Sequence, residues 1–192
     1  MKSTHANRGR AFEHLLDAFH ARYVAQRRAC VVRTPPPMRI LRSVKPGQFV
    51  AVYEAEGPPD YIAHASGVGF MLEAKHSASR RWAFSKLHAH QARRLDEWER
   101  EGGFGAVLLH FASSRESFVL PWSTLASRWH SWNVQHASGR RAASGRASLT
   151  RDDANSLGAL FSRDGWLDVA LALHAARSQS RVDSEHETSA ER

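Results

Sequence analysis

The chain has 192 residues, of which 42% are hydrophobic, so we expect one folded domain with a buried core. Its net charge of +8 favours a polyanionic partner such as nucleic acid, although solubility alone is the alternative. The single cysteine, Cys30, excludes an intramolecular disulfide and a cysteine-built zinc site. The sequence shows no apolar run long enough to span a bilayer and no apolar signal-peptide segment, so we expect a cytoplasmic protein with no membrane partner.

Hydrophobic periodicity and turn signals predict an alternation of helices and short strands. The first helix is expected from Asn7 to about Gln26, where apolar residues recur at three- and four-residue spacing. Strands are expected at 30–32, 38–42, 49–53, 104–111 and 118–120, with a hairpin over 58–75. Further helices are expected around 87–98, 125–132 and 165–177. This order predicts an α/β (α+β) fold in which a mixed central β-sheet is flanked by helices.

The predicted hairpin, PPDYIAHASGVGFMLEAK, carries charged residues at both ends. If Ser66-Gly67 forms a two-residue turn, the pairing register is fixed. Asp60 then lies opposite Glu73, since each is six residues from the turn. Directly opposed residues project to the same face of the sheet, and Lys75 follows Glu73 by two residues on that face. The turn therefore gathers two carboxylates and an amine into one cluster.

Two opposed carboxylates repel each other, and a divalent cation between them removes that repulsion. Mg²⁺ is typically held by one or two carboxylates together with waters and substrate phosphate. Lys75 would then orient the attacking water or stabilise the transition state, which indicates metal-assisted hydrolysis of a phosphodiester. The alternative is structural: Asp60 begins a turn, and Glu73 with Lys75 forms a solvated pair. The apolar residues 70–72 favour a buried strand instead.

Three other polar residues are candidates for the same site. Gln91 falls on the apolar stripe of its helix, so it is either a hydrogen-bonded core amide or a residue that positions water or phosphate. His88 and His90 are two residues apart and do not share a helical face, so we interpret them as substrate-contacting or surface residues. Glu13 lies at the edge of the first helix's apolar stripe and is either a third acidic group or a solvated one.

Six motifs occur together in the order and rough spacing of a known family. They are NRGRAFE at 7–13, RTPPPMRIL at 33–41, PDY at 59–61, EAK at 73–75, FSKLHAHQ at 84–91 and EGG at 101–103. The combination resembles RecU-type Holliday junction resolvases of the PD-(D/E)xK nuclease superfamily. The resemblance spans residue 7 to about 130 and continues more weakly to about 175. The PD…ExK element alone is unspecific, whereas its combination with the other motifs is much more specific.

The resemblance implies a restriction-endonuclease-like fold and a homodimeric, Mg²⁺-dependent endonuclease, with Mn²⁺ able to substitute. Such an enzyme cuts four-way DNA junctions during recombination and repair, and a two-fold dimer supplies the paired symmetric nicks. By matched position, the metal ligands would be Asp60, Glu73 and the Ala74 carbonyl. Lys75 would be the catalytic lysine and Gln91 the motif glutamine.

The same resemblance places Glu13 at the acidic position of the family's first helix. The residues expected to contact DNA are Arg8, Arg10, Arg33, Arg39, Arg80, Arg81 and His88. For any one of them the alternative is a solvated surface group. The segment before Asp60, where the family carries a projecting stalk, contains Glu54 and Glu56 in this chain.

We therefore expect a single nuclease domain over residues 1–177, with a short stalk at 43–58 and a flexible basic loop at 137–148. The polar segment 178–192 is expected to be a disordered tail. Two other functions stay open beside the junction resolvase. One is a junction-binding recombination accessory protein without catalysis, and the other is a nuclease that acts on linear duplex DNA.

Overall fold

The computed structural model describes residues 5–138 and 147–190, with side chains described within 10–138 and 147–180. Its centre is a six-stranded sheet in the order β1-β4-β5-β7-β8-β10. The strands are β1 (Cys30–Arg33), β4 (Tyr61–Ala65), β5 (Val68–Ser77), β7 (Phe104–Phe111), β8 (Glu116–Pro121) and β10 (Ala159–Phe161). Only β5 and β7 pair in parallel in this sheet, so the sheet is mixed as expected.

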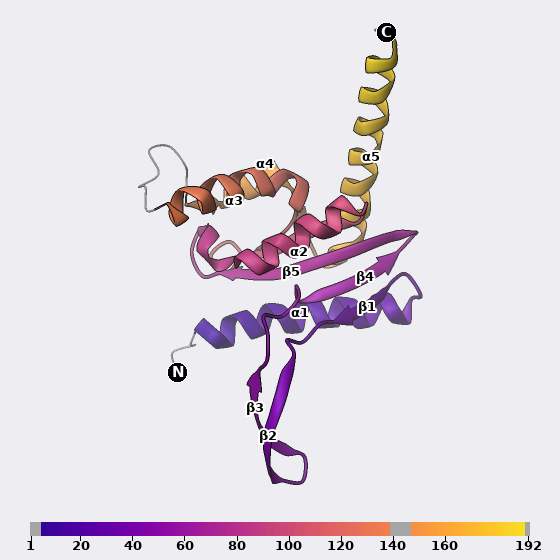
Figure 1. The fold of residues 1–192 in the computed structure, drawn as a ribbon. Coiled ribbons are helices and arrows are strands. Elements are labelled where there is room, and N and C mark those ends of the chain that lie inside the picture. Colours follow the sequence, from indigo (N-terminus) through magenta and orange to yellow (C-terminus); the bar gives the residue numbers. More distant parts are fainter. Residues whose placement is uncertain (1–4, 139–146, 191–192) are drawn as a thin grey trace.

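Helices cover both faces of the sheet (Figure 1). On one face, α1 (His5–Ala25) and the start of α5 (Leu167–Ala190) pack on residues of β5 and β7 such as Phe70 and Leu108. On the other face, α2 (Ala89–Arg100), α3 (Trp122–Ala137) and α4 (Arg151–Leu157) pack on Val107 and Leu109. Alternate residues of β7 thus enter different cores, because successive strand side chains point to opposite faces. The predicted architecture of a mixed sheet flanked by helices is confirmed.

Two small antiparallel ribbons lie outside the main sheet. The strands β2 (Met38–Lys45) and β3 (Gln48–Tyr53) form an arm that projects from the body beyond α1 (Figure 1). The arm is largely exposed, including large apolar side chains on both strands. The second ribbon pairs β6 (Arg81–Ala83) with β9 (Ser148–Thr150), and the 3-10 helix η1 (Phe84–Lys86) follows β6.

The arm and the C-terminal helix differ from expectation. The arm begins at Met38 rather than at residue 43, because its first strand pairs with β3 over its full length to Met38↔Tyr53. The expected disordered tail from Ser178 is wrong over 178–190, where α5 continues to Ala190. Neither Gly nor Pro occurs in that segment, and helix propagation needs no burial once a nucleus exists. Of the expected basic loop, residues 139–146 lie outside the described part of the chain.

Gly158 is a position where the fold has no room for a side chain. It lies between α4 and β10, next to the pair Ala159↔Val119. A Cβ built on Gly158 would fall 2.0 Å from the carbonyl oxygen of Val119. We expect Gly158→Ala to lower the free energy of unfolding by about 2 kcal/mol, because the backbone must shift to accept the methyl group.

Urea denaturation followed by circular dichroism measures this loss, with Ser156→Ala as the control. Ser156 is exposed on α4, and its side chain bonds only the backbone of its own helix. A Gly158→Ala variant as stable as wild type would show that β10 is free to move away from β8.

Candidate active site

The β4–β5 hairpin sets the geometry of the candidate site. Ser66 and Gly67 both have positive φ, 50° and 79°, as a primed two-residue turn requires. The observed pairs run from Ala65↔Val68 to Tyr61↔Leu72. The next position of this register brings Asp60, just before β4, opposite Glu73. The register expected from the sequence is confirmed for the whole ladder that leads to these two carboxylates.

Asp60 is held by backbone groups on both sides. The N–H of Ala74 donates to its Oδ2 at 2.8 Å, and the N–H of Thr34 donates to its carbonyl oxygen at 2.9 Å. The Thr34 hydroxyl also donates to the carbonyl oxygen of Pro59. Burial raises the pKa of Asp60, an effect opposed by the Ala74 N–H and by the charge of Lys75. The carboxylate therefore has a fixed position at the edge of β5.

Glu73, Lys75 and Gln91 form one hydrogen-bonded triangle. The Glu73 side chain is 1% exposed, and its Oε1 lies 2.6 Å from Lys75 Nζ. Gln91 Nε2 donates to the same Oε1 at 2.7 Å, and Lys75 Nζ donates to Gln91 Oε1 at 3.2 Å. Burial raises the pKa of Glu73, while the charge of Lys75 acts in the opposite direction. Gln91 therefore holds both charged groups as a hydrogen-bonded amide, which is the first of its two sequence interpretations, and a role in positioning water or phosphate stays a prediction.

The same residues suit a small divalent cation. The second carboxylate oxygen of Glu73, Oε2, is buried and has no hydrogen-bond partner. An unpaired buried carboxylate oxygen is costly, and a cation would remove that cost. The carbonyl of Ala74 points to the same side as its N–H, toward Asp60, as the strand geometry requires.

A site of this kind differs from a protein-built transition-metal centre. Among residues 5–138 and 147–190, no group of three or more His, Cys, Asp or Glu side chains is placed to hold a metal ion. Two carboxylates and one backbone carbonyl are instead the ligands expected for Mg²⁺, which keeps several waters and binds substrate phosphate. The donor set in the described structure therefore fits Mg²⁺.

Glu13 lies apart from this triangle. It is carried by α1, which covers the opposite face of the sheet from Gln91 and α2. Glu13 forms an ion pair with Arg33 of β1, and Arg33 Nη1 also lies 3.2 Å from Asp17 Oδ2. The charge of Glu13 raises the pKa of Asp60, so the two carboxylates lie near each other without a direct contact. Glu13 thus lies at the border of the site, and Arg33 is paired with Glu13 and Asp17.

The other residues expected to contact DNA are spread over the surface. Those with described, exposed side chains are Arg10, Arg39, Arg80, Arg81 and His88. Arg39 Nε lies 3.5 Å from Glu54 Oε1, and His88 is the N-cap of α2. Arg80 and Arg81 line a cavity of about 590 Å³ together with Arg151. Arg8 is in the first turns of α1, outside the residues whose side chains are described.

Sequence reasoning missed two residues that shape the site. Thr34 binds the backbone carbonyl oxygens of Pro59 and Asp60 and so holds the chain at the start of the site. The sequence feature that could have indicated Thr34 is its position directly before the three prolines, where the chain must bend. Glu56 lies 3.3 Å from His90 of α2. The only sequence feature that indicated Glu56 is its negative charge directly before Gly57-Pro58-Pro59.

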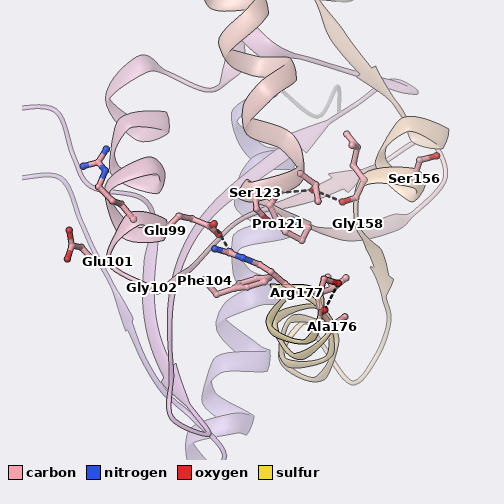
Figure 2. Close-up of a pocket in the computed structure, with 15 residues that line it drawn as sticks. Glu99, Glu101, Gly102, Phe104, Pro121, Ser123, Ser156, Gly158, Ala176 and Arg177 are labelled. Carbon is pink, nitrogen blue, oxygen red and sulfur yellow. Dashed lines mark hydrogen bonds and ion pairs between the residues drawn. The ribbon is translucent and has the colours of Figure 1, made fainter. Parts of the chain in front are cut away.

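A separate cavity of about 1120 Å³ lies between the end of α2, the start of α3 and α5 (Figure 2). Glu99 and Arg177 point toward each other across it, with Arg177 Nη1 2.5 Å from Glu99 Oε2. Because Glu99 Oε1 also accepts the N–H of Gly105 at 3.1 Å, this pair ties α5 to the sheet. None of the candidate catalytic residues lines this cavity.

A mixed sheet with two opposed carboxylates and a lysine on one central hairpin defines the PD-(D/E)xK class of site. The comparison with known families agrees and is more specific. The chain belongs to the recombination protein U (RecU) family, whose model matches residues 7–144. No helix in the described part of the chain has the length and apolar character needed to cross a membrane.

Named relatives lie at moderate sequence identity to this chain. The Holliday junction resolvase RecU of Streptococcus pneumoniae (strain Hungary19A-6) is 30% identical over 131 residues, which cover 65% of this chain and 66% of that protein. The protein of the same name from Geobacillus thermodenitrificans (strain NG80-2) is 29% identical over 148 residues, covering 74% and 72%. The matched segment thus spans about two thirds of the pneumococcal relative.

Among solved structures, the Holliday junction resolvase Hjc of Archaeoglobus fulgidus aligns with a TM-score of 0.45 and 14% identity. That alignment covers 77% of this chain and 93% of Hjc.

Proposed function

We propose that this protein is a Holliday junction resolvase: a Mg²⁺-dependent, structure-selective endonuclease that makes paired nicks in four-way DNA junctions during recombination and repair. Membership of the RecU family supports the substrate class. The observation that carries the chemistry is the buried Glu73 carboxylate opposite Asp60, with its Oε2 unpartnered. The net charge of +8 supports a polyanionic partner.

In this proposal Asp60, Glu73 and the Ala74 carbonyl hold the metal ion. When bound, Mg²⁺ supplies charge neutralisation at a phosphoryl oxygen and lowers the pKa of a water molecule. Mn²⁺ accepts the same oxygen ligands and is expected to substitute. Burial of both carboxylates disfavours their ionised forms, so a cation and the Lys75 ammonium together keep them charged.

Lys75 and Gln91 act on the substrate side of the cluster. The Lys75 ammonium, held 2.6 Å from Glu73, is placed to orient the attacking water or to stabilise charge on the pentacovalent transition state. Gln91 fixes this geometry by donating to Glu73 and accepting from Lys75. Glu13 acts indirectly in this scheme, through its charge near Asp60 and its ion pair with Arg33.

DNA binding is assigned to exposed basic groups around the site. Arg10, Arg39, Arg80, Arg81 and His88 have exposed side chains and are proposed to contact phosphates, and Arg8 is proposed with them from its position. Arg33, which is paired with Glu13 and Asp17, is proposed to support the site and to contact DNA only at its exposed edge.

A homodimer is proposed because two symmetric nicks require two identical sites related by a two-fold axis. The projecting β2–β3 arm is proposed as the stalk that enters the junction. Residues 1–177 are proposed to form a single nuclease domain of a cytoplasmic protein.

The deciding experiment compares a labelled four-way junction with a linear duplex of matching sequence, each with Mg²⁺ and with EDTA. Symmetric nicks in the junction, dependent on Mg²⁺ and absent from the duplex, are expected. Equal cutting of both DNAs would indicate a nuclease without junction selectivity. Tight junction binding without any cutting would indicate an accessory protein and would contradict the proposed catalytic site.

A further inference from the structure

The loop of residues 54–59 connects the β2–β3 arm to Asp60. Both of its ends are held by the proline-rich segment that precedes the arm. The N–H of Glu54 donates to the carbonyl oxygen of Pro37 at 3.0 Å, and Thr34 bonds the carbonyl oxygens of Pro59 and Asp60. In the middle, Gly57 packs so closely on Pro36 that an added Cβ would lie 3.0 Å from Pro36 Cβ. The loop is therefore attached to the strand side of the site.

One contact joins this loop to the helix side of the site. Glu56 Oε1 lies 3.3 Å from Nδ1 of His90, whose side chain is 16% exposed. His90 is the second residue of α2 and directly precedes Gln91. Its ring stacks on that of His88, the N-cap residue, with centroids 5.6 Å apart and planes 7° from parallel. His90 is thus fixed by its neighbour and aimed at the loop.

The two sides of the site carry different parts of the candidate machinery. Asp60 follows Glu56 by four residues on the loop side, whereas Gln91 on the helix side holds Glu73 and Lys75. Among the described side chains of residues 54–59, Glu56 makes the contact that reaches α2, whereas Glu54 pairs with Arg39 of the arm.

We propose that Glu56 and His90 are positioning residues, whose contact couples the placement of the β2–β3 arm to the alignment of Gln91, Glu73 and Lys75. This inference rests on the proposed nuclease function. When the arm settles on DNA, the base of its second strand moves the loop, and the Glu56–His90 contact passes that movement to the first turn of α2. Glu56, one of the two acidic residues of the loop, thus has a role that does not require contact with DNA.

The contact predicts an effect on the cleavage step rather than on folding or binding. Glu56 is 70% exposed, and a contact made by so exposed a carboxylate contributes little to stability, so its loss should leave the fold intact. Misplacement of catalytic groups by a fraction of an ångström is enough to slow a reaction, so we expect a decrease of about tenfold in the single-turnover cleavage rate at saturating junction. Junction affinity should stay unchanged.

The test is a double-mutant cycle with Glu56→Ala, His90→Ala and the double variant, all measured with Mg²⁺ in single-turnover junction cleavage. Each single variant should be about tenfold slower, and the double variant should be no slower than His90→Ala. Glu56→Gln retains an oxygen that accepts from Nδ1 and should keep most of the wild-type rate. Glu54→Ala is the matched control, because Glu54 is a glutamate of the same segment without a contact to α2, and its rate should equal that of wild type.

The coupling would be overturned if the two single substitutions lowered the cleavage rate independently, so that their effects multiply in the double variant. It would also be overturned if both single variants cut at the wild-type rate. A decrease in the rate of Glu54→Ala equal to that of Glu56→Ala would point to the negative charge of the loop instead and would also overturn the coupling. If His90→Ala does not fold, as judged by circular dichroism, the cleavage rates of Glu56→Ala and Glu56→Gln still test the proposal. Equal rates for these two variants would overturn it. Failure of the wild type to cut any DNA would instead reject the proposed function, and this inference with it.

Discussion

Asp60→Asn should reduce the rate of junction cleavage by about a thousandfold or more while junction binding is retained. The amide keeps an oxygen that accepts the Ala74 N–H, so the edge of the hairpin keeps its geometry. What is lost is the negative charge opposite Glu73 and with it one proposed cation ligand. The effect should therefore fall on the chemical step and on the Mg²⁺ concentration needed for activity.

Asp17→Asn is the matched control for this substitution. Like Asp60, Asp17 is an aspartate whose carboxylate accepts a hydrogen bond, but it lies with Arg33 and Tyr61 on the α1 side of the sheet. Its replacement should leave cleavage within a fewfold of wild type. Single-turnover cleavage and gel-shift titration of the same junction measure both quantities. An Asp60→Asn variant with near-normal cleavage would show that the catalytic metal site lies elsewhere.

The second large effect concerns folding stability and pH, through His20 of α1. His20 is 7% exposed, and its Nε2 accepts a hydrogen bond of 2.9 Å from Trp166 Nε1. Burial lowers the pKa of His20 from 6.5 to about 4, despite a smaller opposite effect of Asp17. The folded protein thus keeps a neutral imidazole at pH values where the unfolded chain binds a proton.

The sign of the effect follows from this difference. Since the pKa is lower in the folded state, the stabilising contribution is complete above about pH 6.5 and is lost as the pH falls toward 4. The expected loss attributable to His20 is about 3 kcal/mol over that window. Acid should therefore destabilise the α1–α5 side of the core, where protonation breaks the bond from Trp166.

Urea denaturation at a series of pH values from 7 to 4 measures this contribution. His20→Gln offers Trp166 an acceptor that does not titrate, so its stability should fall less steeply with decreasing pH than that of wild type. The difference between the two slopes isolates His20 from the carboxylates that titrate in the same range. Parallel slopes for the two proteins would show that His20 does not control acid stability.

Local rules were sufficient for the core of the site. A two-residue turn fixes a register, and a register fixes which side chains share a face, so Ser66-Gly67 alone predicted that Asp60, Glu73 and Lys75 converge. Helical spacing likewise predicted that Gln91 faces the sheet. These inferences needed only short-range geometry, which the sequence encodes directly.

Short and irregular elements were missed. The strands β6, β9 and β10 have three residues each, which is too short to show the alternation of apolar and polar residues that predicts a strand. Helix α4 carried a usable signal, since Thr150 and Asp153 form a capping box at its start. The continuation of α5 was missed because polar composition was taken as a sign of disorder, although nothing in residues 178–190 stops a helix.

By itself the sequence determined the mixed α/β class, the hairpin register and the cluster of two carboxylates with a lysine, because each depends on residues near one another along the chain. Only the tertiary structure decided that Glu13 is bound by Arg33 on the far side of the sheet, that Glu56 reaches His90, and that one oxygen of Glu73 is buried without a partner. The two contacts join residues 20 and 34 positions apart, and the unpartnered oxygen depends on burial. Both are set by how the layers pack.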